Sequence, residues 1–444
     1  MLIEFTVENY RSFKGPATLS MVAAKKLKSR INPKLDENNV FQVDEKLSLL
    51  TSAAIYGANA SGKSNLIAAL NFMLRFIRTS SKESQIDEPI HVVPFRLDIE
   101  TEEKPSLFEI VFRHDGMYYR YGFEVTQKRV EREWLFQSLL GKEARLYTRE
   151  GDNYIISTKF KGGQSLKSQT RPNVLFLSVA AQFNNQIAIK LFEWFSSTKV
   201  ISGLEDIGYR DYTISKFMSD PVFKENLINL IKGSDLGINS VSPEELDIND
   251  PRVMPQDMPQ EIKDFIFQAS RMNGKEKTKL PFFRTLHNKK CENGRVEDIL
   301  FDMNEESEGT QKMFIISGPI INALSKGTVL IIDEIEARFH TLLTKKLINL
   351  FNSPETNPSH AQLVFATHDT NLLSNKLMRR DQIWFMEKDE DSVSHLYSLA
   401  ELKIRNDSSF ETDYLMGRYG GIPILGEMKQ TMMNFARDDE QKSE

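Results

Sequence analysis

The sequence predicts an α/β protein with a discontinuous core that holds a parallel sheet, an antiparallel β lobe and a helical insertion. Three observations lead to this class. A strand, a glycine-rich turn and a helix follow one another around residue 60; unbroken apolar strands stand at residues 329–332 and 362–366; and short alternating runs fill residues 89–158. Unbroken apolar strands are typical of a buried parallel sheet, and alternating strands of an antiparallel sheet with one face in water.

The order of these patterns sets the expected domain boundaries. We expect the core at residues 1–88 and 296–444, the β lobe at 89–165 and the helical insertion at 166–295. Within the insertion, residues 242–259 carry four prolines among acidic and amide residues, which predicts a solvated loop. Residues 274–295 are rich in lysine and arginine, and the turn Glu292-Asn293-Gly294 predicts an exposed basic hairpin there.

Net charge and cysteine content limit the partner classes and the compartment. The chain carries 57 basic and 62 acidic side chains, for a formal net charge of −5, so contact with nucleic acid would need a local basic patch. The single cysteine, Cys291, excludes an internal disulfide and a cysteine-built metal cluster. The N-terminus lacks the pattern of a signal peptide, and no apolar stretch is long enough to cross a bilayer. We therefore expect a cytoplasmic protein without a membrane partner.

The glycine-rich turn around residue 60 is the first motif that carries chemistry. It follows an apolar run at 53–56 and opens a helical pattern at 63–78. Small residues let successive backbone N–H groups turn toward a phosphate, the Lys63 ammonium reaches the β- and γ-phosphate oxygens, and the Ser64 hydroxyl can bind Mg²⁺. The pattern predicts a site for ATP and Mg²⁺. Its binding residues would be Gly57, Asn59, Ala60, Ser61, Gly62, Lys63, Ser64 and Asn65.

Two carboxylates end the apolar strand at 329–332. Asp333 and Glu334 stand where enzymes with a phosphate loop hold their metal and activate the attacking water. We therefore expect Asp333 to bind Mg²⁺ and Glu334 to act as the general base. Two acids that merely cap a buried strand are the alternative, which a neighbouring phosphate loop disfavours.

Two further motifs indicate a function only in combination with the phosphate loop and the two acids. His368 follows the apolar strand at 362–366, where an imidazole can hydrogen-bond a γ-phosphate. Ser307 and Gly309 precede an apolar helix at 313–324, so a hydroxyl, a glycine N–H and a helix start form a second anion-binding surface. Taken alone, His368 would more often be structural, and Ser307 would be a plain helix cap.

In this order, the four motifs resemble the ABC ATPase superfamily. The resemblance implies an ABC-type P-loop head in which the Ser-x-Gly motif of one subunit closes over nucleotide held by another. Ser307 and Gly309 would then act in trans on ATP bound at Lys63, in a homodimer or a higher oligomer of such dimers. The motif Ser307-Glu308-Gly309-Thr310-Gln311 departs from the transporter form Leu-Ser-Gly-Gly-Gln, which argues against a transporter.

The N-terminal segment Asn9-Tyr10-Arg11-Ser12-Phe13 resembles that of chromosome-maintenance (SMC) and repair ATPases of the same superfamily. This resemblance implies that Arg11 lies on the adenine and ribose side of the nucleotide. The span 173–232 reads as helical but shows no sustained heptads, so we expect no long coiled-coil arm.

Two remaining motifs narrow the resemblance. Glu334-Ile335-Glu336-Ala337-Arg338-Phe339-His340 and the stretch 414–423, Tyr-Leu-Met-Gly-Arg-Tyr-Gly-Gly-Ile-Pro, look like the stand-alone, SMC/OLD-like abortive-infection ATPases of the AbiLi/RloA type. That implies an ATP-hydrolysing switch in anti-phage defence, with a separate effector protein. Related OLD nucleases add a C-terminal Toprim domain, but only 76 residues follow His368, so we predict no nuclease activity.

Two other functions stay open at this level. A repair-like ATPase could bind DNA through the basic residues of 275–295, although a solvated hairpin face is the simpler interpretation of that cluster. An ATP-bound scaffold could hold a toxin without turnover. Glu336, Arg338 and His340 could contact a neighbouring active site or form a solvated helix start.

Overall fold

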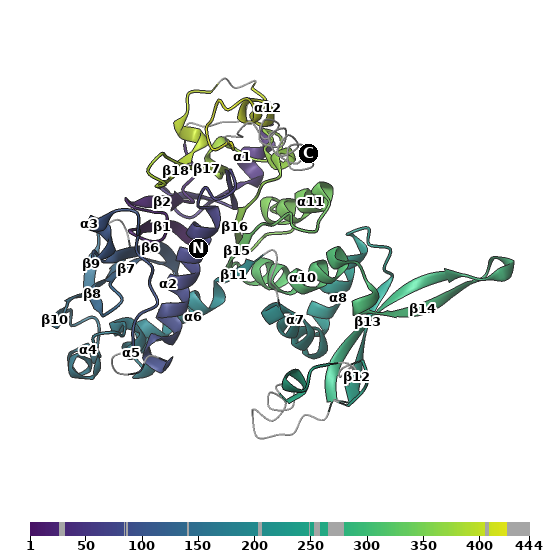
Figure 1. The fold of residues 1–444 in the computed structure, drawn as a ribbon, viewed down its shortest axis with the longest axis horizontal. Helices are drawn as coiled ribbons and strands as arrows, with labels where there is room; N and C mark the ends of the chain where they lie inside the picture. Colours follow the sequence, from purple (N-terminus) through teal and green to yellow (C-terminus); the bar gives the residue numbers. More distant parts are fainter. Residues whose placement is uncertain are drawn as a thin grey trace, which may run out of the picture. The chain divides into compact units, whose positions relative to one another are not determined.

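A computed structural model describes residues 1–25, 32–83, 85, 88–139, 142–202, 207–247, 249–252, 258–264, 279–404 and 408–423. The chain divides into two compact units (Figure 1). The first unit comprises Met1–Gly203, Lys326–Glu336 and Thr344–Glu444, and the second comprises Leu204–Ser325 and Ala337–Leu343.

A six-stranded sheet forms the centre of the first unit. Five neighbouring strands run parallel and the sixth, β18, pairs antiparallel with β17. β5 and β16 are buried along their whole length, which explains their unbroken apolar sequences. The predicted parallel core is confirmed. In sheet order, the strands are β11 (Lys199–Ser202), β15 (Val329–Asp333), β16 (Gln362–Ala366), β5 (Ser52–Gly57), β17 (Ile383–Lys388) and β18 (Ser394–Ser398).

A seven-stranded antiparallel sheet forms the β lobe of the same unit. The turns at Asp115-Gly116 and Gly151-Asp152 lie between paired strands. The lobe extends beyond the expected residues 89–165, because β1 and β2 also belong to it: Phe5 of β1 pairs with Ile110 of β6. In sheet order, the strands are β10 (Asn153–Ile156), β9 (Ala144–Glu150), β8 (Val130–Ser138), β7 (Met117–Val125), β6 (Ser106–His114), β1 (Leu2–Glu8) and β2 (Ala17–Ser20).

Helix α2 (Lys63–Glu83) shares one hydrophobic core with both sheets. Its buried residues Leu66, Leu70 and Met73 belong to the same cluster as Ile55 of β5 and Phe108 of β6. Helices α5 (Phe176–Gln182) and α6 (Gln186–Ser197) pack against α2. The remaining elements of the first unit are α1 (Lys34–Asn38), β3 (Val40–Gln42), β4 (Ser48–Leu50), α3 (Ile99–Glu102), α4 (Gly163–Leu166), α12 (Phe410–Leu415) and most of α11 (Thr341–Asn352).

The second unit combines helices with a three-stranded antiparallel sheet. Phe217, Leu227, Phe283 and Phe314 are members of its hydrophobic core. The predicted hairpin is confirmed, because Glu292–Gly294 turns the chain between two antiparallel strands. The elements are α7 (Ile207–Ser219), α8 (Pro221–Lys232), β12 (Ser240–Asp247), β13 (Lys279–Lys290), β14 (Val296–Asp302) and α10 (Glu308–Lys326).

Two expectations for this unit need correction. The region predicted as a loop at 242–259 begins inside strand β12, where Pro243 pairs with Phe283. A proline is tolerated there because β12 is an edge strand of its sheet. The expected core boundary at residue 296 falls between β13 and β14, since residues after 296 pair with β13. Lys275 and Lys277 of the basic segment lie outside the described residues.

Within the described ranges, no helix combines the length and the apolar character that a membrane span requires.

Candidate functional site

The phosphate loop lies between β5 and α2, as the sequence predicts. Two of its glycines are sterically required: a Cβ on Gly57 would lie 2.3 Å from the Met386 carbonyl oxygen, and one on Gly62 would lie 2.3 Å from Ser394 Oγ. Ala60 has a positive φ of 61°, which marks the sharp turn. Asn59, Ala60 and Ser64 are exposed, and therefore accessible to a ligand.

Lys63 is buried, and backbone carbonyl groups of the phosphate loop hold its side chain over the loop. Its Nζ donates hydrogen bonds to the carbonyl oxygens of Gly57 at 2.8 Å and Ala58 at 2.9 Å. Burial lowers the pKa of Lys63 to about 8, an effect that the negative charges of Asp333, Glu336 and Glu334 partly offset. An ammonium has three donors, so one stays available for a phosphate oxygen.

The carboxylates at the end of β15 leave buried oxygens without hydrogen bonds. Asp333 Oδ1 and Glu336 Oε2 have no partner among the described atoms. Glu334 lies between them with a positive φ of 49°, which redirects the chain immediately after the strand. Buried carboxylate oxygens without partners, close enough to Lys63 to shift its pKa, fit a Mg²⁺ ion and its water shell.

His368 follows β16 and belongs to the same group. Its backbone N–H donates to Glu336 Oε1 at 2.6 Å, and its imidazole is exposed. Burial and the positive charge of Lys63 lower the pKa of His368, while Glu336, Glu334 and Asp333 act in the opposite direction. The imidazole is therefore within electrostatic reach of the phosphate loop and of all three acids.

Glu336 is the functional candidate that sequence reasoning left unassigned. The sequence allowed a contact with a neighbouring subunit or a solvated helix start, whereas the structure places the Glu336 side chain among the acids of its own chain. Ile335 is buried and its N–H bonds to the Ala366 carbonyl oxygen, so the chain turns back to the sheet edge. The apolar residue Ile335 between two acids is the sequence signal that could have indicated an inward position of Glu336.

The N-terminal segment braces the start of α2. Asn65 Nδ2 donates to Ser12 Oγ at 2.8 Å, and Arg11 Nη1 donates to Asn65 Oδ1 at 3.4 Å. Ser394 Oγ donates to the Ser61 carbonyl oxygen at 2.7 Å. The exposed Arg11 also borders a cavity of about 340 Å³, which Tyr10, Phe72, Arg75 and His91 line with it. Arg11 thus lies beside both the phosphate loop helix and an open cavity.

Ser307 and Gly309 belong to the second unit and pack on the segment 337–339. Ser307 Oγ accepts a hydrogen bond from the Thr310 N–H at 3.1 Å, and the Ser307 residue is exposed. A Cβ on Gly309 would lie 2.7 Å from the Arg338 carbonyl oxygen. Lys312 Nζ donates to the Ala337 carbonyl oxygen at 2.6 Å. The start of α10 is therefore ordered by contacts within its own unit.

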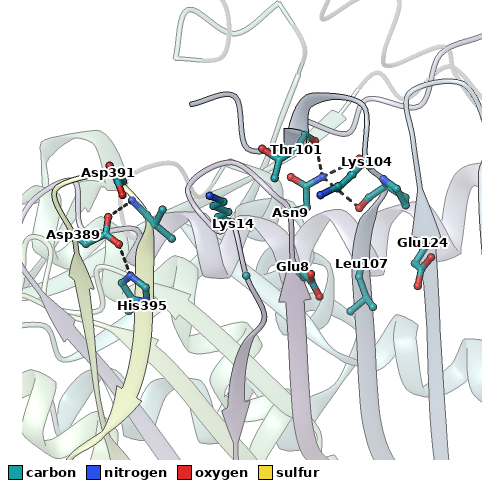
Figure 2. A pocket seen from close by; sticks show the side chains of 13 residues that line it. Glu8, Asn9, Lys14, Thr101, Lys104, Leu107, Glu124, Asp389, Asp391 and His395 are labelled. Atoms are coloured by element: carbon teal, nitrogen blue, oxygen red, sulfur yellow. Dashed lines mark hydrogen bonds and ion pairs between the residues drawn. The ribbon is translucent and has the colours of Figure 1, made fainter. Parts of the chain in front are cut away.

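A second cavity, of about 620 Å³, adjoins the N-terminal segment and the β17–β18 turn (Figure 2). Several of its polar groups bond to one another: His395 Nε2 lies 2.7 Å from Asp389 Oδ2, and Asn9 Nδ2 donates to the carbonyl oxygens of Thr101 and Lys104. None of the lining residues has a buried side-chain N or O atom without a hydrogen-bond partner. This cavity differs in that respect from the phosphate loop site.

A phosphate loop between a parallel strand and a helix, with carboxylates at the end of a neighbouring strand, defines the chain as a P-loop NTPase of the α/β class. The chain belongs to the family described as "AAA domain, putative AbiEii toxin, Type IV TA system", whose model matches residues 52–374. As members of a P-loop ATPase family, such chains bind ATP with Mg²⁺.

Among solved structures, the chain is similar to an SMC head domain from Thermotoga maritima, at 12% identity and a TM-score of 0.40 over 91% of this chain and 99% of the other. It is also similar to an SMC head bound to the C-terminal winged-helix domain of ScpA, at 11% identity and a TM-score of 0.43 over 89% and 97% of the two chains. No curated protein matches the chain.

Proposed function

We propose that the chain binds and hydrolyses ATP at this site and acts as a switch in abortive-infection defence, together with a separate effector protein. One observation carries the catalytic part: the buried Lys63, which has a spare donor, lies within electrostatic reach of a group of acids in which buried oxygens of Asp333 and Glu336 have no partners among the described atoms. The family description, with its reference to toxin–antitoxin systems, supports the defence part.

Each site residue has a role that follows from its position. The N–H groups of residues 57–62 and the Lys63 ammonium hold the phosphates, and Arg11 borders the base and ribose. Ser64 and Asp333 would hold Mg²⁺, which would neutralise phosphate charge. Glu334 accepts a proton from the attacking water, and the exposed His368 imidazole hydrogen-bonds the terminal phosphate.

Phosphate release by the purified chain tests the enzymatic part. Glu334→Gln should lower the release rate by about 10²–10⁴-fold, because it removes the proton acceptor, and should leave nucleotide binding intact. Glu390→Gln, at an exposed position of the β17–β18 turn, is the matched control. Absence of release by the wild-type chain, both alone and with its separate effector protein, would support a non-hydrolysing scaffold instead.

The Ser-x-Gly segment of a second copy would complete the site. Ser307 is exposed and immediately precedes the 19-residue helix α10, so this residue is accessible to another chain. In a Glu334→Gln background, we expect ATP to produce a dimer in sedimentation experiments. Ser307→Arg should abolish that dimer, whereas Ser219→Arg, at the exposed end of α7, should not. A chain that stays monomeric with ATP contradicts this arrangement.

The DNA-binding alternative receives little support from the hairpin. Across the β13–β14 ladder, Lys289 stands opposite Glu297 and Asn288 opposite Asp298. The acids of β14 therefore offset the basic charge of β13, whereas binding to a phosphate backbone needs a surface of one sign. DNA binding that weakens steeply with salt and with loss of Lys289 and Lys290 would restore this alternative.

A further inference from the structure

The C-terminal stretch 414–423 has no role in the site described so far, although the sequence singles it out. It begins in the last turn of α12 and continues beside the strand end at which the phosphate loop begins. We propose that residues 419–421, which rest against Gly57 and are held by the hydroxyls of Tyr414 and Tyr397, form a positioning element that supports the phosphate loop and thereby its affinity for nucleotide. This inference rests on the proposed nucleotide binding.

The segment approaches the phosphate loop at a glycine, which has no side chain. Gly421 has a positive φ of 65°, and a Cβ built on it would lie 3.7 Å from Gly57 Cα and 3.5 Å from the Met386 carbonyl oxygen. Met386 is the residue that pairs with Gly57 in the β5–β17 ladder. Gly421 therefore lies against the strand pair at the position where β5 ends and the loop starts.

Two tyrosine hydroxyls hold the segment in place. Tyr414 Oη donates to the Gly421 carbonyl oxygen at 2.9 Å, and Tyr397 Oη donates to the Tyr419 carbonyl oxygen at 2.7 Å. The Tyr414 ring stacks on Phe385 of β17, with centroids 5.3 Å apart and an interplanar angle of 18°. Hydrogen bonds thus fix the backbone of the segment, and ring stacking fixes it to the central sheet.

The neighbouring glycine leaves no room for a side chain. Gly420 has a φ of 72°, and a Cβ on it would lie 2.5 Å from Tyr397 Oη and 2.7 Å from Glu387 Oε2. The paired glycines let the chain pass between the anchoring tyrosine and the sheet edge. A segment that only covered the sheet would not need this close backbone approach.

Tyr56 connects the segment with the acids. It precedes Gly57, its ring is buried, and it meets the Tyr414 ring edge-on at 6.2 Å. Its hydroxyl has no hydrogen-bond partner among the described atoms. Burial raises the pKa of Tyr56, and the charges of Asp369 and Glu336 add to the effect, so this ring lies within electrostatic reach of the site. A displaced segment would disturb both Gly57 and the surroundings of Glu336.

Two glycine variants separate a positioning role from a merely structural one. Gly421→Ala and Gly417→Ala place a methyl group at similar positive φ angles, 65° and 75°, so both should lower the Tm by a similar few degrees. At Gly417 the nearest atom to the new Cβ is the flexible end of the Ile422 side chain, and no atom of the phosphate loop is close.

The readout is the Kd for Mg-ATP, measured by calorimetry on the full chain carrying Glu334→Gln so that turnover does not interfere. We expect Gly421→Ala to raise the Kd by about three- to tenfold, because alanine is strained at this positive φ and shifts the backbone that rests against Gly57, which misaligns the loop donors. Gly417→Ala should stay within about twofold of its parent. A Tyr414→Phe variant, which keeps the ring and removes the bond to Gly421, should raise the Kd by about two- to fivefold.

The outcomes are distinguishable. If the parent binds Mg-ATP and both glycine variants bind it equally well, the positioning role is overturned while the nucleotide site stands. If Gly421→Ala does not fold, an unchanged Kd for Tyr414→Phe overturns the role instead. If the parent binds no nucleotide, the proposed function fails and this inference fails with it.

Discussion

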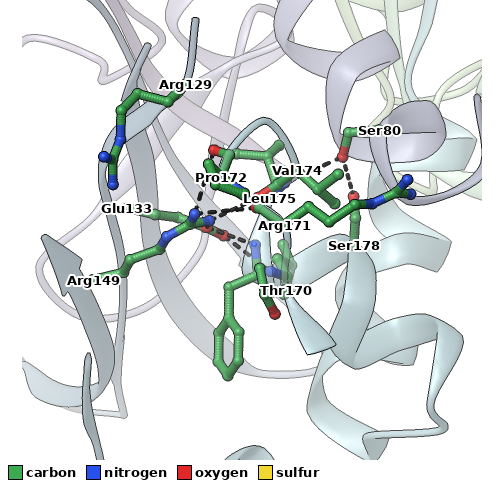
Figure 3. Close-up of polar contacts among 12 residues, drawn as sticks. Ser80, Arg129, Glu133, Arg149, Thr170, Arg171, Pro172, Val174, Leu175 and Ser178 are labelled. Atoms are coloured by element: carbon green, nitrogen blue, oxygen red, sulfur yellow. Dashed lines mark hydrogen bonds and ion pairs between the residues drawn. The ribbon is translucent and has the colours of Figure 1, made fainter. Parts of the chain in front are cut away.

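Two charged clusters in the first unit differ in how completely they are hydrogen-bonded. The lobe cluster consists of Glu133 and Arg149 with the groups that they contact (Figure 3). Glu133 accepts hydrogen bonds from the hydroxyls of Tyr121 and Tyr147 and from two backbone N–H groups at the start of α5. Arg149 donates to four backbone carbonyl oxygens, including that of Val174 at 2.7 Å.

The site cluster consists of Lys63, Asp333 and Glu336. Its buried ammonium bonds only to two carbonyl oxygens of the loop, and one oxygen of each carboxylate has no partner among the described atoms. In the lobe cluster, every side-chain N and O atom of Glu133 and Arg149 has a hydrogen-bond partner.

This contrast distinguishes a structural charged cluster from a ligand-binding one. A fully bonded network offsets the cost of burying charge and holds neighbouring elements together. An incompletely bonded one costs stability, so its retention indicates that a ligand supplies the missing partners. Three predictions examine this contrast, in order of decreasing expected effect.

The largest effect should come from the lobe cluster. Glu133→Ala removes the acceptor of four hydrogen bonds and leaves Arg149 as an uncompensated buried charge. We expect the free energy of unfolding, measured in urea, to fall by about 3–5 kcal/mol. Glu150→Ala, which breaks an exposed pair with Arg132, should cost at most about 1 kcal/mol. A loss below 1 kcal/mol for Glu133→Ala would show that the lobe cluster is not structural.

Asp333→Asn should change the stability little and weaken ligand binding, the opposite of the effect expected for Glu133→Ala. Because Asp333 is half-buried and its Oδ1 is without a partner, the free energy of unfolding without ligand should change by less than about 1 kcal/mol. The gain in nucleotide affinity that Mg²⁺ provides should shrink by at least about tenfold, as measured by titration with and without Mg²⁺. A variant that unfolds readily yet keeps the full Mg²⁺ effect would reverse the assignment of the two clusters.

The smallest effect is a pH dependence from Lys63, whose pKa is lowered to about 8 from its ordinary 10.5. Nucleotide needs the charged form, so its affinity should fall by up to about tenfold per pH unit above pH 8. The unfolded chain binds more protons between pH 8 and 10.5, so the stability of the free protein should rise in that window.

Titrations from pH 7 to 10 measure both slopes for Lys63, and Lys63→Met should abolish the rise in stability. A Kd that stays constant across pH 8, with wild-type Lys63 present, would place the loss of the Lys63 proton above this range and would remove the basis for the prediction.

Much of the site could be predicted from local sequence, because short segments suffice to define it. The loop at 57–64 needs small residues and a helix start, and the strands β15 and β16 need unbroken apolar runs that end in functional side chains. In each case the side chain and the element that positions it lie within about ten residues, so hydrogen-bonding and steric rules act locally.

Long-range contacts determined those parts of the fold and of the site that local sequence could not predict. That β1 joins β6, that Glu336 turns inward to His368, and that Gly421 rests against Gly57 all depend on pairing and packing between segments far apart in the chain. A local pattern fixes which residues are able to form a phosphate loop. Only the packed tertiary structure fixes which distant backbone supports that loop and which buried charges stay without partners, because burial is a property of the assembled core.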